Sequence, residues 1–359
     1  MNAKLFKAVA SAVVFLGILT TEGAVGTVTG PYSHRNLQLF LIHGETRLES
    51  RNYVTLSEAM TKGIVVVRET GRVQELSIEN RSEKVTVFLN AGDIVKGGRQ
   101  DRTVRDDLIL PPQSGWVPLE SFCVEHGRWT KRNAEDAANF SANSKVLSSR
   151  KLKMASRYEM NQGDVWAGVA EQQEKLNSNI SRLAGKSVDT RSSDSSSSLQ
   201  LTLENKDLAG IRKQYMDALE SLVNGKSDVI GFVYAINGEI NSVEVYNNKS
   251  LFRSLWPKLL DAAVTEAITD YDTEGTFEAV QASSLTAFFE AALSGKISER
   301  SVSKSTRVRT YSGVGAVLFE TLDEDAVGVW LHKTFINKGQ ETIKVPLDRE
   351  SYLNQAPRR

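Results

Sequence analysis

Hydrophobic and polar residues alternate along the first third of the chain, which is the pattern of partly buried β-strands. Residues 37–41 and 85–89 alternate, and residues 64–67 form a continuous β-branched run. Leu56, Ala59 and Met60 predict a short helix that ends before Gly63. Residues 36 to about 129 are therefore predicted to be rich in strands.

From about residue 149 the hydrophobic period changes to that of a helix. An apolar face over residues 165–183 predicts a long helix ending near Gly185, and residues 208–222 predict another, closed by Gly225. Two strands, 229–235 and 240–245, are predicted to pair across a turn at Asn237 and Gly238.

The last third of the chain predicts helices followed by strands. Ser250 is expected to cap a helix that Pro257 should kink or restart, and residues 285–292 predict a further helix ended by Gly295. Strands are expected at 308–310, 314–318 and 327–335. Strands grouped first, a helical middle and closing strands that return to the main sheet predict the α+β class.

The low-complexity stretch at residues 192–198 is almost entirely serine and is predicted to lie in a flexible loop, residues 185–204, between two halves. We expect the β-rich half with its trailing helix, 27–184, and the α+β half, 205–345, to form one composite domain. Residues 346–359 are expected to be a tail.

Residues 1–26 have the features of a secretory signal peptide. Lys4 and Lys7 precede an apolar run, residues 8–19, and the small residues Ala24 and Gly26 stand where a signal peptidase cuts. We expect an exported protein, periplasmic or secreted, that begins near Thr27 and has no membrane attachment after cleavage; an uncleaved anchor is the alternative.

Composition narrows the possible partners. Of the 359 residues 40% are hydrophobic, and 44 Lys and Arg balance 44 Asp and Glu. With no net charge the chain has no overall attraction to nucleic acid, so any anion site must be local. Cys123 is the only cysteine, which excludes an internal disulfide, and it is expected to be a small buried residue rather than a nucleophile.

Two charged clusters about thirty residues apart are the strongest candidates for a functional site. The first combines glycines with charged and amide side chains: Lys96, Gly97, Gly98, Arg99, Gln100, Asp101 and Arg102. Adjacent glycines permit a tight turn whose backbone N–H groups converge on an anion, and arginines add donors matched to phosphate or carboxylate. The alternative is an internal network of ion pairs, because Asp106 and Asp107 follow the arginines.

The second cluster consists of Glu125, His126, Gly127, Arg128 and Trp129. Arg128 and Trp129 could stack on a base or ring of a ligand, or Trp129 could fill the core under Arg128. Glu125 is the candidate general base or sugar-hydroxyl acceptor, and Asp101 is a second candidate base. His332 lies in an alternating strand and could face a site or solvent.

Established catalytic motifs are incomplete in this chain. Gly98 and Arg99 stand where a P-loop needs Lys and Ser or Thr, and Leu318 stands where a dinucleotide fingerprint needs its third glycine. We predict no cofactor. We also predict no metal site, because no close ligand spacing occurs among His43, His126, His332 and Cys123.

At these residues the chain resembles a known family. The first cluster, followed by Cys123, Val124, Glu125, Arg128 and Trp129, looks like the signature of the ADP-ribosylglycohydrolase and rhodanese-phosphatase associated protein domain, a domain of unknown function. Gln162, Val165 and Trp166, the segment 231–260 and the strand 329–335 with His332 extend the resemblance over residues 36–335. It implies association with enzymes that handle ADP-ribose and phosphorylated substrates.

Three functions follow as hypotheses. The first is binding of a small anionic molecule, such as one derived from a nucleotide or sugar phosphate, by Arg99, Arg102 and Arg128, with Gln100, Asp101 and Glu125 orienting it. The second is hydrolysis of such a molecule, with Glu125 or Asp101 as general base and the arginines stabilising developing charge. The third is a structural or partner-binding protein whose clusters brace the fold. Whether the chain is an enzyme, and which protein partner it has, stay open.

Overall fold

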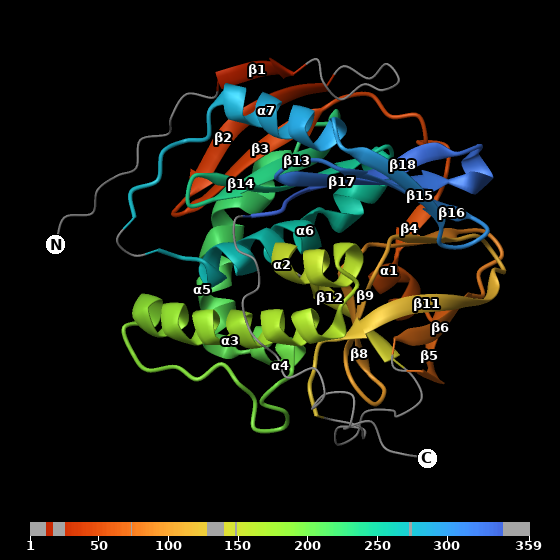
Figure 1. Ribbon diagram of the computed structural model, residues 1–359, viewed down its shortest axis with the longest axis horizontal. Coiled ribbons are helices and arrows are strands. Elements are labelled where there is room, and N and C mark those ends of the chain that lie inside the picture. Colours follow the sequence, from red (N-terminus) through yellow and green to blue (C-terminus); the bar gives the residue numbers. More distant parts are fainter. Residues whose placement is uncertain are drawn as a thin grey trace.

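The computed structural model describes residues 12–16, 26–72, 74–127, 140–147, 149–272 and 275–339, and it confirms the α+β class. Its largest element is an antiparallel nine-stranded sheet (Figure 1). In spatial order the strands are β1 (Ala12–Leu16), β2 (Gly26–His34), β3 (Leu37–His43), β13 (Val229–Ile236), β14 (Glu239–Tyr246), β18 (Val329–Asn337), β17 (Ala316–Asp323), β16 (Thr306–Ser312) and β15 (Lys296–Ser301). Because β3 pairs with β13, both halves of the chain contribute to one sheet.

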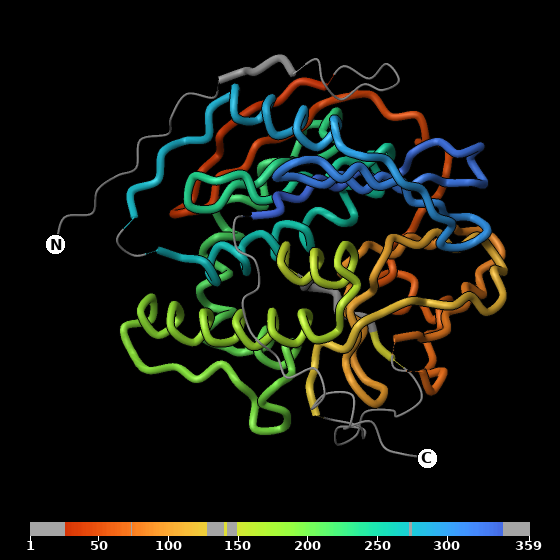
Figure 2. The backbone as a smooth tube through the Cα atoms, in the orientation of Figure 1, coloured from red at the N-terminus to blue at the C-terminus, as the bar shows by residue number. Residues whose placement is uncertain are grey.

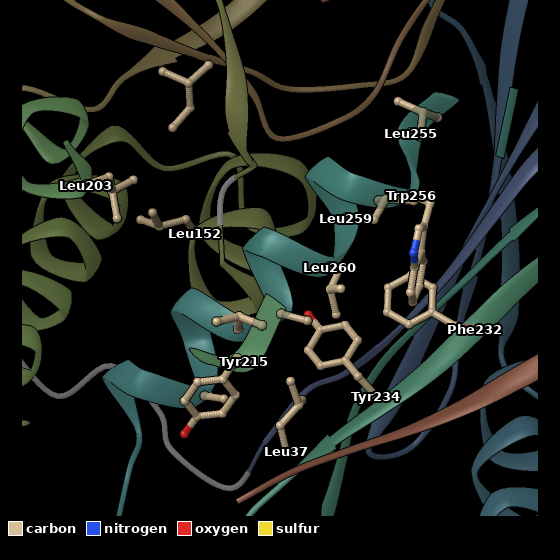
Figure 3. Close-up of a cluster of buried hydrophobic side chains, with 14 of the residues drawn as sticks. Leu37, Leu152, Leu203, Tyr215, Phe232, Tyr234, Leu255, Trp256, Leu259 and Leu260 are labelled. Carbon is tan, nitrogen blue, oxygen red and sulfur yellow. The ribbon is translucent and has the colours of Figure 1, made fainter. Parts of the chain in front are cut away.

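Helices cover both faces of this sheet. Helix α7 (Ala282–Leu293) lies on one face, and α6 (Lys249–Thr269) lies on the other, with α3 (Gln162–Ala184) and α5 (Lys206–Leu219) packed against α6 (Figure 1). Alternation along β13 explains the two layers, since Val233 faces the α7 layer whereas Phe232 and Tyr234 face α6 (Figure 3). The strand is buried on both sides.

A smaller lobe is built from β4 to β12, drawn in orange to yellow in Figure 2. It contains α1 (Leu56–Thr61) and has its own apolar core. Its six-stranded sheet has the order β12 (Phe140–Leu147), β8 (Asp93–Gly97), β9 (Arg102–Val104), β11 (Gly115–Cys123), β6 (Glu75–Asn80) and β5 (Val65–Arg72). Its three-stranded sheet has the order β10 (Leu108–Leu110), β7 (Thr86–Leu89) and β4 (Tyr53–Thr55).

Short helical segments connect these layers. They are α2 (Arg150–Lys153), the π-helix Met154–Tyr158, α4 (Leu199–Leu203) and the 3₁₀ turns Glu220–Val223 and Glu324–Ala326. The π-helix follows α2 directly. Such helices are rare in proteins, and those that occur often lie at functional sites.

Local predictions agree with the structure where a specific residue terminates an element. Gly185 ends α3 with φ 64°, and Asn237 and Gly238 turn the hairpin with φ 53° and 80°. The predicted cap of α6 is wrong: Asn248, not Ser250, accepts the hydrogen bond from the Leu251 N–H. Of the two effects expected of Pro257, a kink or a restart, the restart does not occur, because α6 continues as one helix through this residue.

The serine-rich segment differs most from its prediction. The predicted loop, residues 185–204, contains α4, and Ser198 at the end of the serine-rich segment is its fully buried N-cap, whose side chain accepts from the Leu201 N–H. Buried tertiary partners therefore order part of a stretch whose composition predicts a flexible loop. Of the predicted signal, only β1 and Gly26 are described, and the predicted tail, 346–359, lies outside the described residues. Over the described ranges, no helix is both long enough and apolar enough to cross a bilayer.

Candidate functional site

The two charged clusters lie next to each other in the smaller lobe. Arg102 is opposite Cys123 where β9 pairs with β11. The Asp101 N–H donates to Glu125 Oε2 at 3.3 Å, and the Val124 N–H donates to the Asp101 carbonyl at 3.1 Å. Strand pairing thus brings together two segments that are well separated in the sequence.

The glycine turn presents its N–H groups to carboxylates of the protein itself. The Gly97 N–H donates to Asp101 Oδ1 and the Arg99 N–H donates to Glu69 Oε1, both at 3.0 Å. Gly98 has φ 57°, and a Cβ there would lie 2.3 Å from the Phe140 ring. Close packing and a left-handed backbone therefore explain Gly98 without a ligand.

Arg102 is 1% exposed, so solvent does not reach it. Its Nη1 donates to Gln100 Oε1 at 3.2 Å and to Cys123 Sγ at 3.0 Å, and its Nη2 lies 3.7 Å from Glu69 Oε1. Burial is the main reason that the pKa of Cys123 is raised to about 11, which leaves the thiol neutral. Cys123 is thus buried as predicted and is unsuited to nucleophilic attack.

The remaining cluster residues connect this lobe to the helices. The Ser198 hydroxyl donates to Asp101 Oδ2 at 3.1 Å, and Lys96 pairs with Glu204 at 2.8 Å. Glu125 is fully buried. His126 packs edge-on against Trp166, with ring centroids 4.8 Å apart.

These contacts favour the bracing alternative for the described part of the clusters. Asp101, Arg102 and Glu125 are sealed from solvent, whereas Arg99 is exposed. Arg128 and Trp129 lie outside the described residues. The predicted ligand-binding and catalytic roles stay predictions.

One observation at the clusters favours a bound ligand over the bracing alternative. Gln100 Nε2 and Arg102 Nε are buried donors that make no hydrogen bond to any described residue. An unsatisfied buried donor costs about 1–3 kcal/mol, so packing alone does not account for both groups. An oxygen-rich ligand would satisfy them, but the carboxylate of Glu69 already lies 3.7 Å from the Arg102 guanidinium.

His332 has its hydrogen bonds elsewhere, in a buried network between the large sheet and the smaller lobe. Its Nδ1 lies 2.8 Å from Asp107 Oδ2 and its Nε2 lies 2.7 Å from Glu244 Oε2, while the Tyr246 ring stacks on it at 4.3 Å. Burial alone would lower the pKa of His332, but the two carboxylates raise it. We therefore take His332 as an imidazolium that donates to both.

Cations from α2 and the π-helix complete this network. Lys153 pairs with Glu244 at 2.7 Å, and Arg157 approaches Asp107 at 3.3 Å and Asp106 at 3.5 Å. Against the cost of burial, Lys153 and His332 hold the pKa of Glu244 at about 2, and Arg157 and His332 keep that of Asp107 well below its usual range. No sequence spacing links these residues, because they come from α2, the π-helix, β14, β18 and the loop between β9 and β10.

A solvent-connected cavity of about 510 Å³ lies between α2, α3, the end of α6 and the β13–β14 hairpin. Figure 1 shows α2, α3 and α6 beside one another. The cavity is lined mainly by polar side chains, among them Arg150, Gln172, Lys175, Asn241 and Glu266. Its volume lies in the range of small-molecule sites.

Glu266 is the most buried acid of this cavity. It is 4% exposed and accepts from the Arg150 N–H at 3.2 Å, from Asn241 Nδ2 at 3.1 Å and from the Tyr234 hydroxyl at 3.2 Å. Burial raises the pKa of its carboxyl group. Sequence reasoning missed the cavity, since its lining comes from segments that carry no recognisable motif.

A family model described as the ARG and Rhodanese-Phosphatase-superfamily-associated Protein domain matches residues 27–336. The family resemblance predicted from the signature is thus confirmed. The matched residues include both clusters, His332 and the whole cavity lining except Asn337. No curated protein and no solved structure matches the chain.

Proposed function

We propose that this chain, which belongs to the family of ARG and Rhodanese-Phosphatase-superfamily-associated Protein domains, binds a small polar molecule. The single observation that supports this is the cavity of about 510 Å³ beside α6. Its lining residues lie on α2, α3, α6 and the β13–β14 hairpin, elements packed against the core of the large sheet. Such elements hold polar groups in fixed positions for a ligand.

A ligand at the charged clusters is the second candidate, favoured by the unbonded donors Gln100 Nε2 and Arg102 Nε. It is the anion-binding hypothesis, and it needs an opening that exposes Arg102. The hydrolase hypothesis further needs substrate to reach Glu125 or Asp101, both of which are fully buried. We therefore rank these below binding in the cavity.

We expect a cavity ligand to raise the melting temperature of the protein, and the rise to depend on the cavity lining. A ligand at one hundred times its dissociation constant adds about 2.7 kcal/mol to the free energy of unfolding. The measurement is thermal unfolding with glucose, maltose, glycine, glucose 6-phosphate and ADP-ribose. The rise should disappear in the double variant Gln172→Leu, Lys175→Met, which removes two polar groups that line the cavity.

Two further variants serve as controls. Glu174→Gln changes an exposed residue on the same helix that does not line the cavity, so the ligand effect should persist. Arg102→Gln should lower the starting melting temperature and leave the ligand effect intact. Loss of the effect in Arg102→Gln, with retention in the cavity variant, would instead support the second candidate.

We also propose that the protein is exported and begins near Thr27. The apolar run at residues 8–19 and the family match, which starts at residue 27, support this. Cleavage there would remove β1 from the edge of the large sheet and leave β2 as the edge strand. When the full-length sequence is expressed with its natural N-terminus, intact mass measurement of the exported protein should show a chain that starts at or near Thr27. Recovery of the uncleaved chain from the cytosol would contradict export.

A further inference from the structure

We infer that the cavity takes an uncharged, hydroxyl-rich molecule, such as a sugar or polyol, rather than an anion. This inference rests on the proposed function, because it names the class of ligand for the same cavity. Three properties of the lining carry it: the balance of charge, the state of the basic groups and the abundance of side-chain amides.

The lining contains more acids than bases. Among the described residues of the lining, three basic side chains, Arg150, Lys151 and Lys175, stand against four acidic ones, Glu171, Glu239, Glu266 and Asp270. An anionic ligand would therefore meet like charge from carboxylates on α3, α6 and the hairpin. This excess disfavours phosphate and carboxylate ligands.

The two lysines of the lining are also already engaged. Lys175 Nζ lies 2.9 Å from Asp270 Oδ1 and 3.1 Å from Glu171 Oε1, and Lys151 also pairs with Glu171. Arg150 Nη1 donates to the Asn337 carbonyl at 3.0 Å, whereas its Nε, 4.0 Å from Glu266 Oε1, makes no hydrogen bond to the described residues. A phosphate would have to break the lysine contacts before it could pair with either lysine, and the carboxylates left behind would lose their partners.

Amides make up much of the remaining lining: Gln172, Asn179, Asn237, Asn241 and Asn337. An amide offers both donors and acceptors, as a hydroxyl group does, so it can pair with a hydroxyl in either direction. The Nδ2 groups of the four asparagines already donate within the protein, so Gln172 is the amide on which the argument depends. Gln172 has the most capacity to spare. Its Oε1 accepts one long hydrogen bond, 3.4 Å from Ser149 Oγ, and its Nε2 donates none to the described residues.

Apolar ligands fit this lining poorly. Ile236, Ile240 and Gly168 are its only aliphatic or glycine members, and Tyr271 is its only aromatic ring. A predominantly apolar molecule would bury the amides and carboxylates without giving them hydrogen bonds, which costs free energy. A neutral molecule with several hydroxyl groups satisfies all three properties.

Matched pairs of sugars with and without phosphate test the class of ligand. Thermal unfolding and calorimetric titration of the full chain would compare glucose, mannose and galactose with their 6-phosphates. We expect at least one neutral sugar to bind, its phosphate to bind at least tenfold more weakly, and Gln172→Leu to weaken the neutral sugar. Glu174→Gln should bind as the unchanged protein does.

The outcomes separate the two proposals. Tighter binding of the phosphates or of ADP-ribose, lost in Gln172→Leu, would overturn the inference of an uncharged ligand and keep the cavity as the binding site. If none of these compounds binds, both the inference and the proposed binding in the cavity are overturned. The same holds if a compound binds but Gln172→Leu and Lys175→Met leave its binding unchanged.

Discussion

Replacing Asp107 by alanine should lower the free energy of unfolding by roughly 3–5 kcal/mol, the usual cost of removing one partner from a buried ion pair. Asp107 is fully buried and accepts from the Ala91 N–H at 2.7 Å, as well as from His332 and Arg157. Without it the two cations keep their charge in the core with one carboxylate fewer to balance them. Urea unfolding measured by circular dichroism gives the change directly.

An exposed ion pair provides the matched control for this substitution. Asp217 pairs with Lys213 one turn away on α5, and its side chain is 62% exposed. Asp217→Ala should change the free energy of unfolding by at most about 0.5 kcal/mol. If Asp107→Ala costs no more than Asp217→Ala, the buried network does not stabilise the junction between the two lobes.

The same network should make stability fall on both sides of a window between about pH 4.5 and 6.5. The pKa of Glu244 is about 2 in the folded protein against an ordinary 4.5, so its contribution is complete above pH 4.5 and is lost as the pH falls toward 2. The pKa of His332 is raised above 6.5, so its contribution is complete below that pH and is lost as the pH rises through the folded value. The Glu244 shift corresponds to roughly 3 kcal/mol.

Two variants that remove a titratable group separate the acidic and alkaline limbs of this profile. Urea unfolding at about pH 3, 5.5 and 8.5 would compare the unchanged protein with Glu244→Gln and His332→Gln. The difference in free energy of unfolding between the unchanged protein and Glu244→Gln should shrink as the pH falls from 5.5 to 3. The corresponding difference for His332→Gln should shrink as the pH rises from 5.5 to 8.5. Differences that do not vary with pH would show that neither group titrates as the contacts imply.

The sequence predicted the fold well where local chemistry determines an element. Gly185 and the Asn237–Gly238 pair end or turn their elements because few other residues adopt a left-handed backbone. Ser198 shows the limit of local reasoning. Composition predicts a flexible loop there, but a hydrogen bond to Asp101, ninety-seven residues away, fixes it in the core.

The candidate site was less predictable because charge and glycine content do not reveal burial. Arg102 has the side chain of an anion-binding residue, yet the strand pairing of β9 places it in the interior beside Cys123. Asp107 was assigned only to a possible salt-bridge network near the arginines, and its partner His332 lies 225 residues further along. Only three-dimensional contacts could join such residues, and the same holds for Gln172 and Glu266 at the cavity.

The pairing of β3 with β13 and of β14 with β18 determines when the large sheet can be completed during folding. β18 lies between β14 and β17, so the largest sheet gains its last internal strand only when residues 329–337 have left the ribosome. Contacts between such distant segments slow folding. A nascent chain of this protein therefore completes its largest sheet only at the end of synthesis, after β18 has emerged.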